Sequence, residues 1–283
     1  ARVKYKAAIK QMPLLIEKVL DSNNTDSLDD FFSSPIETIL EKLVQDTITL
    51  EFGEFSAFQL SSSKLNNNIY LPKYYDPTIT DILNRLGNNC QLLSVQELID
   101  SNVIMISTGD EIGKMAYGTG DIPFVRTSDF SNWEIKSDTK QGVSEEIYRQ
   151  YAAKEDVRAL DILLVRDGTY LVGSSCIITD ADTKMLYCGG LIKIRVCNLD
   201  VVDPYCLLGL LNSYIVKRQI RTKQFTRDVI DTLGQRFKEV IIPIPKEVRV
   251  KMEISRRVQA IVHNRIDARD TIRKLSKELG EQP

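Results

Sequence analysis

The stretch DILLVRDG (161–168) decides the fold, because it places four consecutive aliphatic residues between an aspartate and a charged turn that ends in glycine. A short apolar run with such boundaries is typical of a buried strand. Further runs of this kind occur along the chain, each bounded by turn-forming residues: VIMIST (103–108), CIITDAD (176–182), LIKIRV (191–196) and VIIPIP (240–245). Together these runs predict a β-rich domain over residues 69–245.

Helices are expected within and around this domain. One is predicted near 144–153 and another over 204–217, where Pro204 follows Asp203 and suits a first helical turn. Residues 1–68 are expected to form a helical N-terminal segment, since apolar residues recur there at spacings of three and four. The predicted fold class is therefore α+β: a β-rich domain with packed helices, preceded by a helical segment and followed by a long helix at 246–283.

A heptad-like apolar stripe runs along the sequence from 247 to 279. A helix of this length would measure about 50 Å, which is more than a small β domain can cover with its own surface. We therefore expect the helix to pair with a second helix, and the alternative is that it lies back on its own domain. The residues expected at the pairing seam are Ile254, Val258, Ile261, Ile272, Leu275 and Leu279, with Arg265 as a polar interruption.

Charge is unevenly distributed along the chain, whose net charge is −2. Residues 191–283 contain 19 basic and 11 acidic residues, a net charge of +8, which leaves −10 on the preceding 190 residues. Within Lys217–Lys238 there are seven basic and two acidic residues. A basic tract of this kind can neutralise DNA phosphates, although charge alone favours the simpler interpretation of a solvated helix face.

The sequence lacks the residue patterns of common catalytic and metal centres. The single histidine, His263, lies in the heptad-like stripe and is poorly placed for a catalytic triad. The five cysteines include no Cys-x-x-Cys pair, so no zinc site is expected. No glycine-rich phosphate loop occurs, and Asp203-Pro204-Tyr205 lacks the second proline of an adenine methyltransferase motif. We expect a non-catalytic chain that needs no metal or cofactor.

The cysteine usage and hydropathy also bear on location. Unpaired thiols are typical of a reducing compartment, and no apolar run is long enough to cross a bilayer. The first residues carry positive charge but no long apolar core, so no signal peptide is expected. These features predict a cytoplasmic protein without membrane association.

One segment, GTGDIPFVRTSD (118–129) followed by FSNWEI (130–135), closely resembles a hallmark of DNA target-recognition domains. Further strings continue the resemblance in the same order: 161–169 with 172–173, then 203–208, 211–213, 217–220, 230–234 and 241–245, and finally the long helix. This ordered set covers about residues 94–280. It is similar to the specificity subunits of type I restriction-modification systems and to the C-terminal recognition regions of related adenine-N6 DNA methyltransferases.

The resemblance implies a function and a set of partners. The β-rich domain would read part of a double-stranded DNA target in the major groove, and the long helix would be a spacer that packs on a second such helix. A methyltransferase subunit or domain would supply catalysis, and in some systems a restriction-motor subunit also joins. The first 90 residues match this family poorly.

Two arrangements stay open, because specificity subunits usually carry two recognition domains and two spacer helices, and only one of each is found here. Either two copies form a homodimer, or the chain is the recognition part of a single-chain DNA adenine-N6 methyltransferase. The poor match of the first 90 residues slightly favours the second arrangement. A helical scaffold that binds only proteins is a third hypothesis.

Three loops carry side chains suited to DNA readout, in which cations and hydroxyls hold phosphates while forked or amide groups read base edges. They are 113–119, 166–174 and 221–227. Arg126 and Arg166 each precede an aspartate and fit a turn-stabilising ion pair as well as a DNA contact. The candidate DNA-binding residues are Lys114, Tyr117, Thr119, Arg126, Thr127, Arg166, Thr169, Tyr170, Ser174, Arg221, Lys223, Gln224 and Arg227, of which Arg221, Lys223 and Arg227 are the strongest phosphate candidates.

Overall fold

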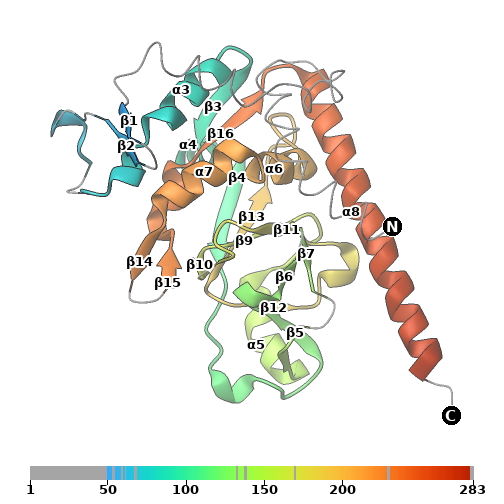
Figure 1. Ribbon diagram of the computed structural model, residues 1–283. Coiled ribbons are helices and arrows are strands. Elements are labelled where there is room, and N and C mark those ends of the chain that lie inside the picture. Colours follow the sequence, from blue (N-terminus) through green and yellow to red (C-terminus); the bar gives the residue numbers. More distant parts are fainter. Residues whose placement is uncertain are drawn as a thin grey trace.

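Figure 1 shows the computed structural model, which describes residues 50–280 apart from 53, 54, 59, 61, 67, 68, 132, 137, 138, 169, 228 and 229. The expected helical segment 1–68 lies outside the described residues as far as position 49. Where its description begins, the segment is not helical as expected, because β1 (Leu50–Phe52) and β2 (Phe55–Ala57) form an antiparallel hairpin. The sequence LEFGEFSA alternates apolar and polar residues on both sides of a glycine, which is a strand pattern.

The centre of the molecule is an antiparallel sheet with the strand order β11–β9–β13–β4. Its strands confirm four of the predicted runs and are β4 (Ile104–Thr108), β9 (Ile162–Val165), β11 (Ser175–Ile177) and β13 (Leu191–Val196). Strand β4 forms one edge of this sheet. The fold class is α+β, as predicted.

Strand β9 is buried on both faces, which explains why it is apolar at every position. Ile162 and Leu164 belong to a first core, while Leu163 and Val165 belong to a second core on the other face of the sheet. All four side chains are fully buried. Because side chains alternate between the faces of a strand, a continuous apolar run is what a strand between two cores requires.

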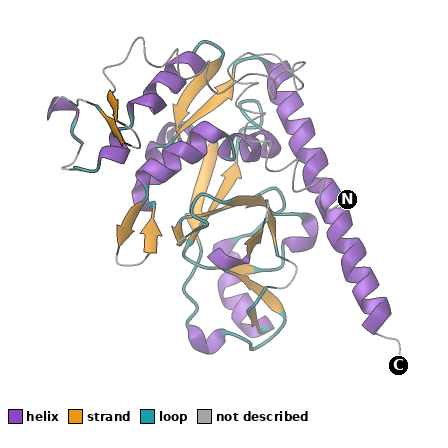
Figure 2. Ribbon diagram, in the orientation of Figure 1, coloured by secondary structure: helices purple, strands orange, loops and turns teal. Residues whose placement is uncertain are grey.

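The first core lies between the sheet and a layer of helices. Its helices are α3 (Pro77–Leu86), α4 (Val95–Asp100), α6 (Pro204–Leu211), α7 (Tyr214–Lys223) and the first part of α8 (Val248–Gly280). Strands β3 (Cys90–Ser94) and β16 (Ile241–Pro245) pair beside them. Figure 2 shows α8 running along one side of the molecule, with its far end beyond the strands.

Smaller elements cover the other face and the ends of the sheet. A separate sheet of three strands has the order β12–β5–β8. Helix α5 packs against the core residues of this sheet, Phe124, Val143 and Leu186. These smaller elements are β5 (Ile122–Val125), β6 (Phe130–Ser131), β7 (Glu134–Ile135), β8 (Gly142–Val143), α5 (Glu145–Glu155) and β12 (Leu186–Tyr187), together with the short 3-10 helices η2 (Ser62–Lys64), η3 (Pro72–Tyr75), η4 (Lys114–Ala116), η5 (Thr127–Asp129), η6 (Asp180–Asp182) and η7 (Gly234–Glu239).

The single helix predicted over 204–217 is two helices, α6 and α7. Asp203 caps α6 by accepting hydrogen bonds from the backbone N–H groups of Tyr205 and Cys206 at 2.9 and 3.0 Å. Ser213 then caps α7 by accepting one from Val216 at 3.4 Å. Ser213, a second N-cap residue within the apolar pattern, therefore starts a new helix. This helix, α7, is basic and continues to Lys223.

Helix α8 behaves differently along its length. Ile254 and Val258 are buried in the first core and Ile261 packs against it, so these three seam residues are covered by the chain itself. Ion pairs of Arg265 with Glu134 and of Arg269 with Asp182 continue the contact with the domain. The expectation that all six seam residues pair with a second helix is therefore wrong for Ile254, Val258 and Ile261.

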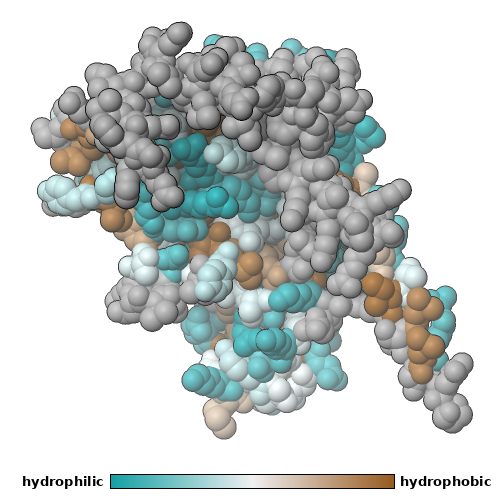
Figure 3. All heavy atoms as spheres, in the orientation of Figure 1, coloured by the Kyte–Doolittle hydropathy of each residue, from teal (hydrophilic) through white to brown (hydrophobic). Residues whose placement is uncertain are grey.

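The rest of the stripe on α8 is open. Ile272, Leu275 and Leu279 are 57%, 50% and 72% exposed. Figure 3 shows hydrophobic side chains gathered on this far part of α8, where it leaves the body of the molecule. No helix in the described part of the chain combines the length and the apolar character that spanning a membrane would take.

This division of α8 predicts a difference in stability. We expect Ile254→Ala to lower the free energy of unfolding by about 2–5 kcal/mol, because it leaves a cavity in the first core. Leu279→Ala removes the same kind of side chain from the exposed end and is expected to change it by less than about 0.5 kcal/mol. Urea denaturation followed by circular dichroism measures both. Similar effects for the two variants would contradict this assignment.

Candidate nucleic-acid interface

Two of the three predicted loops, 166–174 and 221–227, lie together. Strands β10 (Asp167–Gly168), β15 (Ile230–Thr232) and β14 (Phe225–Arg227) form one three-stranded sheet that joins them. Thr232 pairs with Asp167 on one side and with Phe225 on the other, and its hydroxyl donates to Asp167 at 2.6 Å. The sequence separated these loops by about fifty residues, and the fold brings them to one place.

The end of the second loop is fixed to helix α7. Gly173 has a φ of 81°, and a Cβ built there would lie 2.7 Å from Cγ2 of Ile220. The Lys217 amine donates a hydrogen bond to the carbonyl oxygen of Gly173, and Nε2 of Gln224 donates to that of Val172 at 3.4 Å. A glycine is needed here because the backbone must take a left-handed conformation against the helix. Gln224, a candidate for reading adenine, therefore also holds the loop.

Arg166 combines both of the roles that its sequence suggested. Its Nε and Nη2 donate to Oδ2 of Asp167 at 2.9 and 2.7 Å, which is the turn-stabilising ion pair. Its Nη1 has no partner among the described residues. The side chain is 30% exposed, so the aspartate orients a guanidinium that still reaches solvent.

Arg126 and Thr127 have structural roles. The backbone N–H of Arg126 donates to Oδ2 of the buried Asp129 at 2.9 Å, and its Nε lies 3.6 Å from the same oxygen. Thr127 packs beside Gly190, where an added Cβ would come within 2.8 Å of its methyl group. Ser174 is half-buried, and its backbone exchanges turn hydrogen bonds with Val165 and Leu171. Arg126 and Ser174 therefore stabilise turns, and Thr127 packs against the backbone at Gly190.

The first loop, 113–119, lies elsewhere. Tyr117 stacks on Phe124 with ring centroids 5.4 Å apart. The Thr119 hydroxyl donates to the carbonyl of Ala116 at 2.8 Å and accepts from the N–H of Ser144 at 3.0 Å. Lys114 is exposed. In Figure 1 the green segment between β4 and β5, which contains this loop, descends to the opposite end of the molecule from α7. The three loops therefore do not form one continuous site.

The phosphate candidates of the third loop have different environments. The Lys223 amine pairs with Glu239 at 2.9 Å and lies 4.5 Å from the ring centroid of Tyr74, and its side chain is only 14% exposed. Arg221 is exposed and has no carboxylate partner within the described part of the chain. The side chain of Arg227, and all of Thr169, lie outside the described residues. Tyr170, next to Thr169, is 95% exposed.

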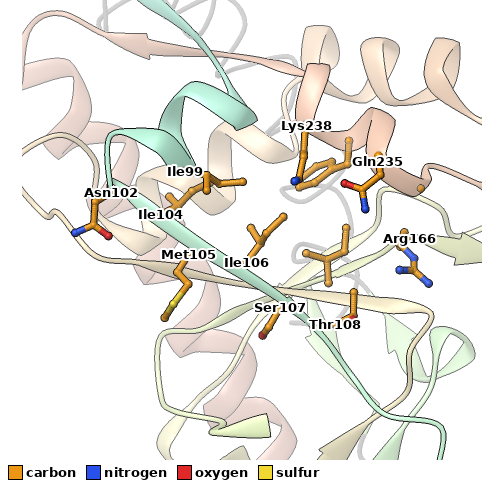
Figure 4. A pocket seen from close by; sticks show the side chains of 13 residues that line it. Ile99, Asn102, Ile104, Met105, Ile106, Ser107, Thr108, Arg166, Gln235 and Lys238 are labelled. Atoms are coloured by element: carbon orange, nitrogen blue, oxygen red, sulfur yellow. The ribbon is translucent and has the colours of Figure 1, made fainter. Parts of the chain in front are cut away.

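A hollow of about 460 Å³ opens beside the edge strand β4 (Figure 4). We call it the edge hollow. Its walls combine apolar side chains such as Ile106 and Phe237 with polar groups on Arg166, Gln235 and Lys238. Figure 4 shows Gln235, Lys238 and Arg166 around the same opening. Of this set, only Arg166 was predicted as a DNA-binding residue, because Gln235 and Lys238 lie in η7, a short 3-10 helix that no apolar period marks.

A second hollow, also about 460 Å³, lies between η3 and the exposed face of α7. We call it the basic hollow. Figure 3 shows hydrophilic side chains gathered over the position of α7 in Figure 1. The lining residues are Lys73, Asp76, Tyr214, Lys217, Arg218, Arg221 and Thr222. The spacing of Lys217, Arg218 and Arg221 along a helix could have indicated this face, but nothing in the sequence joined Lys73 to it.

The charges of the basic hollow are only partly neutralised. Arg218 pairs with Oδ2 of Asp76, at 2.7 Å from Nη2 and 3.1 Å from Nε. Burial, with a smaller contribution from the neighbouring Arg221 guanidinium, lowers the pKa of Lys217 to about 7. Lys73 is exposed and has no acidic partner in the part of the chain that the structure describes.

A third cluster of charged groups belongs to the core. Burial raises the pKa of Glu155 to about 7, and its carboxylate accepts from the backbone N–H groups of Tyr187 at 2.9 Å and of Asp110 at 3.3 Å. Arg195 donates to Asp161 and Asp156. These groups join α5 to the two sheets, and their hydrogen bonds are made within the fold. Among the described residues, no three His, Cys, Asp or Glu side chains lie close enough to hold a metal ion.

The contact between Gly173 and α7 gives a testable prediction. We expect Gly173→Ala to lower the free energy of unfolding by about 2–4 kcal/mol, since it adds backbone strain and overlap with Ile220. Gly118 has a similar φ of 73° with nothing within 4 Å of its Cβ position, so Gly118→Ala is expected to cost only the strain, about 1–2 kcal/mol. Guanidinium denaturation measures the difference. Equal costs would contradict the close approach of the loop to the helix.

Comparison with known proteins finds similar solved structures. The HsdS subunit from Thermoanaerobacter tengcongensis shares 14% identity, with a TM-score of 0.43 over 96% of this chain and 48% of that chain. A structure described as the basis of complex assembly and conformational transition of the type I R-M system shares 14%, with a TM-score of 0.42 over 97% and 52%. The type I restriction-modification S subunit from M. genitalium shares 12%, with a TM-score of 0.40 over 72% and 49%. The chain thus spans about half the length of each. No family model matches the sequence, and no curated protein matches it.

Proposed function

We propose that this chain recognises double-stranded DNA and positions a methyltransferase, present as a partner subunit or a joined domain, on its target. The observation that carries the proposal is the meeting of loops 166–174 and 221–227 beside two hollows lined by cations. Both loops carry cations, hydroxyls and amide groups of the kinds that contact DNA. Their joining by one small sheet gives them a common rigid support, which a readout surface needs.

The two hollows suit different parts of a duplex. The edge hollow offers an arginine fork, an amide and a lysine over an apolar floor, the groups that contact base edges and thymine methyls. The basic hollow offers cations and a tyrosine hydroxyl, the groups that hold phosphates. The two hollows are neighbours. Glu239, which follows Lys238 of the edge hollow, contacts Lys223 and Tyr74, and Tyr74 follows Lys73 of the basic hollow. Tyr170 extends from the adjoining loop as a further contact.

We propose a separate role for the far part of α8. Ile272, Leu275 and Leu279 step by three and four residues, as a pairing seam does, and all three are exposed. A second copy of the chain is the proposed partner helix, which would rebuild a two-fold arrangement. If the chain is instead the recognition part of a longer methyltransferase, the same seam would pack on a helix of that enzyme. The DNA-binding surface is the same in both arrangements.

The DNA-binding proposal is tested by selecting bound sequences from a pool of random duplexes and then measuring affinity for the enriched duplex against salt. Lys238→Gln is expected to weaken binding and to reduce the slope of log K against log salt by about one, because one cation no longer meets the DNA. Lys274→Gln makes the same change on the exposed end of α8 and is expected to leave both values unchanged. A pool that shows no enriched sequence would contradict sequence-specific recognition.

The pairing proposal is tested by light scattering over a range of concentrations. The wild type is expected to have the mass of a dimer, and Ile272→Asp with Leu275→Asp the mass of a monomer, because two charges would be buried in the seam. Asn264→Asp with Thr271→Asp adds the same charge at exposed positions of the same helix and serves as the control. Circular dichroism checks that all variants stay folded. A monomeric wild type, or a double variant that still dimerises, would argue against a homodimer.

A further inference from the structure

The basic hollow carries more positive charge than its own residues neutralise. Of its four cations, only Arg218 has a carboxylate partner, Asp76. Lys73 and Arg221 are exposed, and neither has an acidic partner within the described ranges. The Lys217 amine donates to a carbonyl oxygen, that of Gly173, which carries no net charge. Two exposed cations and the Lys217 amine, from two separate elements, therefore line the hollow without an acidic partner among the described residues.

The polar groups around these cations are arranged for an anion. The Tyr214 hydroxyl accepts from Nη1 of Arg218 at 3.2 Å, which leaves its own hydrogen available to donate. The Thr222 hydroxyl is already used, since it donates to the carbonyl of Gln219 at 2.8 Å. The only acid in the lining, Asp76, is held by Arg218 and by the N–H and hydroxyl of Thr78. The lining of the hollow thus offers hydrogen-bond donors, and its one carboxylate, Asp76, is already bonded.

We propose that the basic hollow is a binding site for one phosphate group, with Arg221, Lys73 and Lys217 as its cationic ligands and Tyr214 as a neutral donor. Its volume exceeds that of a phosphate, which leaves room for the attached sugar. If the phosphate belongs to a DNA backbone, the site rests on the proposed function and fixes the register of the duplex. A phosphate on a free nucleotide would be held by the same groups.

Above pH 7, phosphate binding in this hollow is expected to be accompanied by protonation of Lys217. The groups that face the amine are Arg221, Arg218 and Tyr214 on its own helix, Lys73 and Asp76 from the adjoining segment, and the carbonyl of Gly173 from the loop. In the free protein, burial and Arg221 hold the pKa of Lys217 at about 7, so the amine is largely neutral above that pH. A phosphate between the cations favours the charged amine and raises this pKa.

The direction of the pH effect follows from this linkage. Below pH 7 the amine is charged before and after binding, and affinity does not change with its titration. Above pH 7 each binding event must add a proton, so affinity falls as pH rises, by up to about tenfold per pH unit until the pKa of the bound form is reached. DNA phosphodiesters do not titrate in this range, so the change reports on the protein.

The experiment measures the affinity of the full chain for a short duplex DNA between pH 7 and 9 at fixed ionic strength. For the wild type we expect a loss of about threefold to tenfold per pH unit. Lys217→Arg keeps the charge at every pH and is expected to bind with a nearly flat profile. Lys217→Met is expected to be weaker at pH 7 and also flat. Lys274→Met, on the far end of α8, is the control and should behave as the wild type.

A second arm uses inorganic phosphate at pH 7, with chloride at the same ionic strength as the control, and follows the thermal unfolding temperature. Phosphate is expected to raise this temperature for the wild type and not for Arg221→Gln. If the duplex binds but its affinity is independent of pH, or if Lys217→Arg keeps the pH dependence, the phosphate site is overturned while DNA recognition stands. If no duplex binds but phosphate still stabilises through Arg221, the proposed function fails and the hollow holds a free phosphate compound. If neither binds, the site is overturned.

Discussion

The burial of strand β9 between two cores is the constraint on which the rest of the molecule depends. Ile162 and Leu164 face the helical layer, while Leu163 and Val165 face the second core. A polar residue at any of these positions would leave an unpaired group inside one of the two cores. Because β9 is held on both faces, the residues that follow it leave the sheet at a fixed point. Those residues begin the loop that carries Arg166.

From this fixed point, the proposed DNA-binding surface is built by short-range contacts. Gly173 lies against Ile220, and Lys217 and Gln224 hold the loop carbonyls from α7. The same helix carries Arg218 and Arg221, which line the basic hollow together with Lys217. The contact that rigidifies the loop therefore also sets the place of the cations. This contact also desolvates the Lys217 amine, which lowers its pKa. In the proposed phosphate site, binding above pH 7 therefore depends on protonation of that amine.

Helix α8 is packed against the domain over its first part and exposed over its last part. As far as Arg269 it is held by the first core and by two ion pairs to the domain, so its direction is set by the fold. Beyond that residue Ile272, Leu275 and Leu279 continue the apolar stripe and are exposed.

Most elements could be predicted from the sequence because they depend on local patterns. The aliphatic run at 162–165 has the pattern of a buried strand, and Asp203 before Pro204 indicates the start of a helix. The cap at Ser213, which divides the single helix predicted over 204–217, was not predicted from the sequence. The composition of the basic hollow depended on tertiary structure, since Lys73 and Arg221 are far apart in sequence and meet only when η3 packs on α7. Only the tertiary structure shows that Lys223 is paired, with Glu239. It likewise shows that the first half of α8 packs against the core. Hydrophobic periodicity states which face of an element is apolar, but what covers that face, and which charges find partners, depends on packing between distant segments.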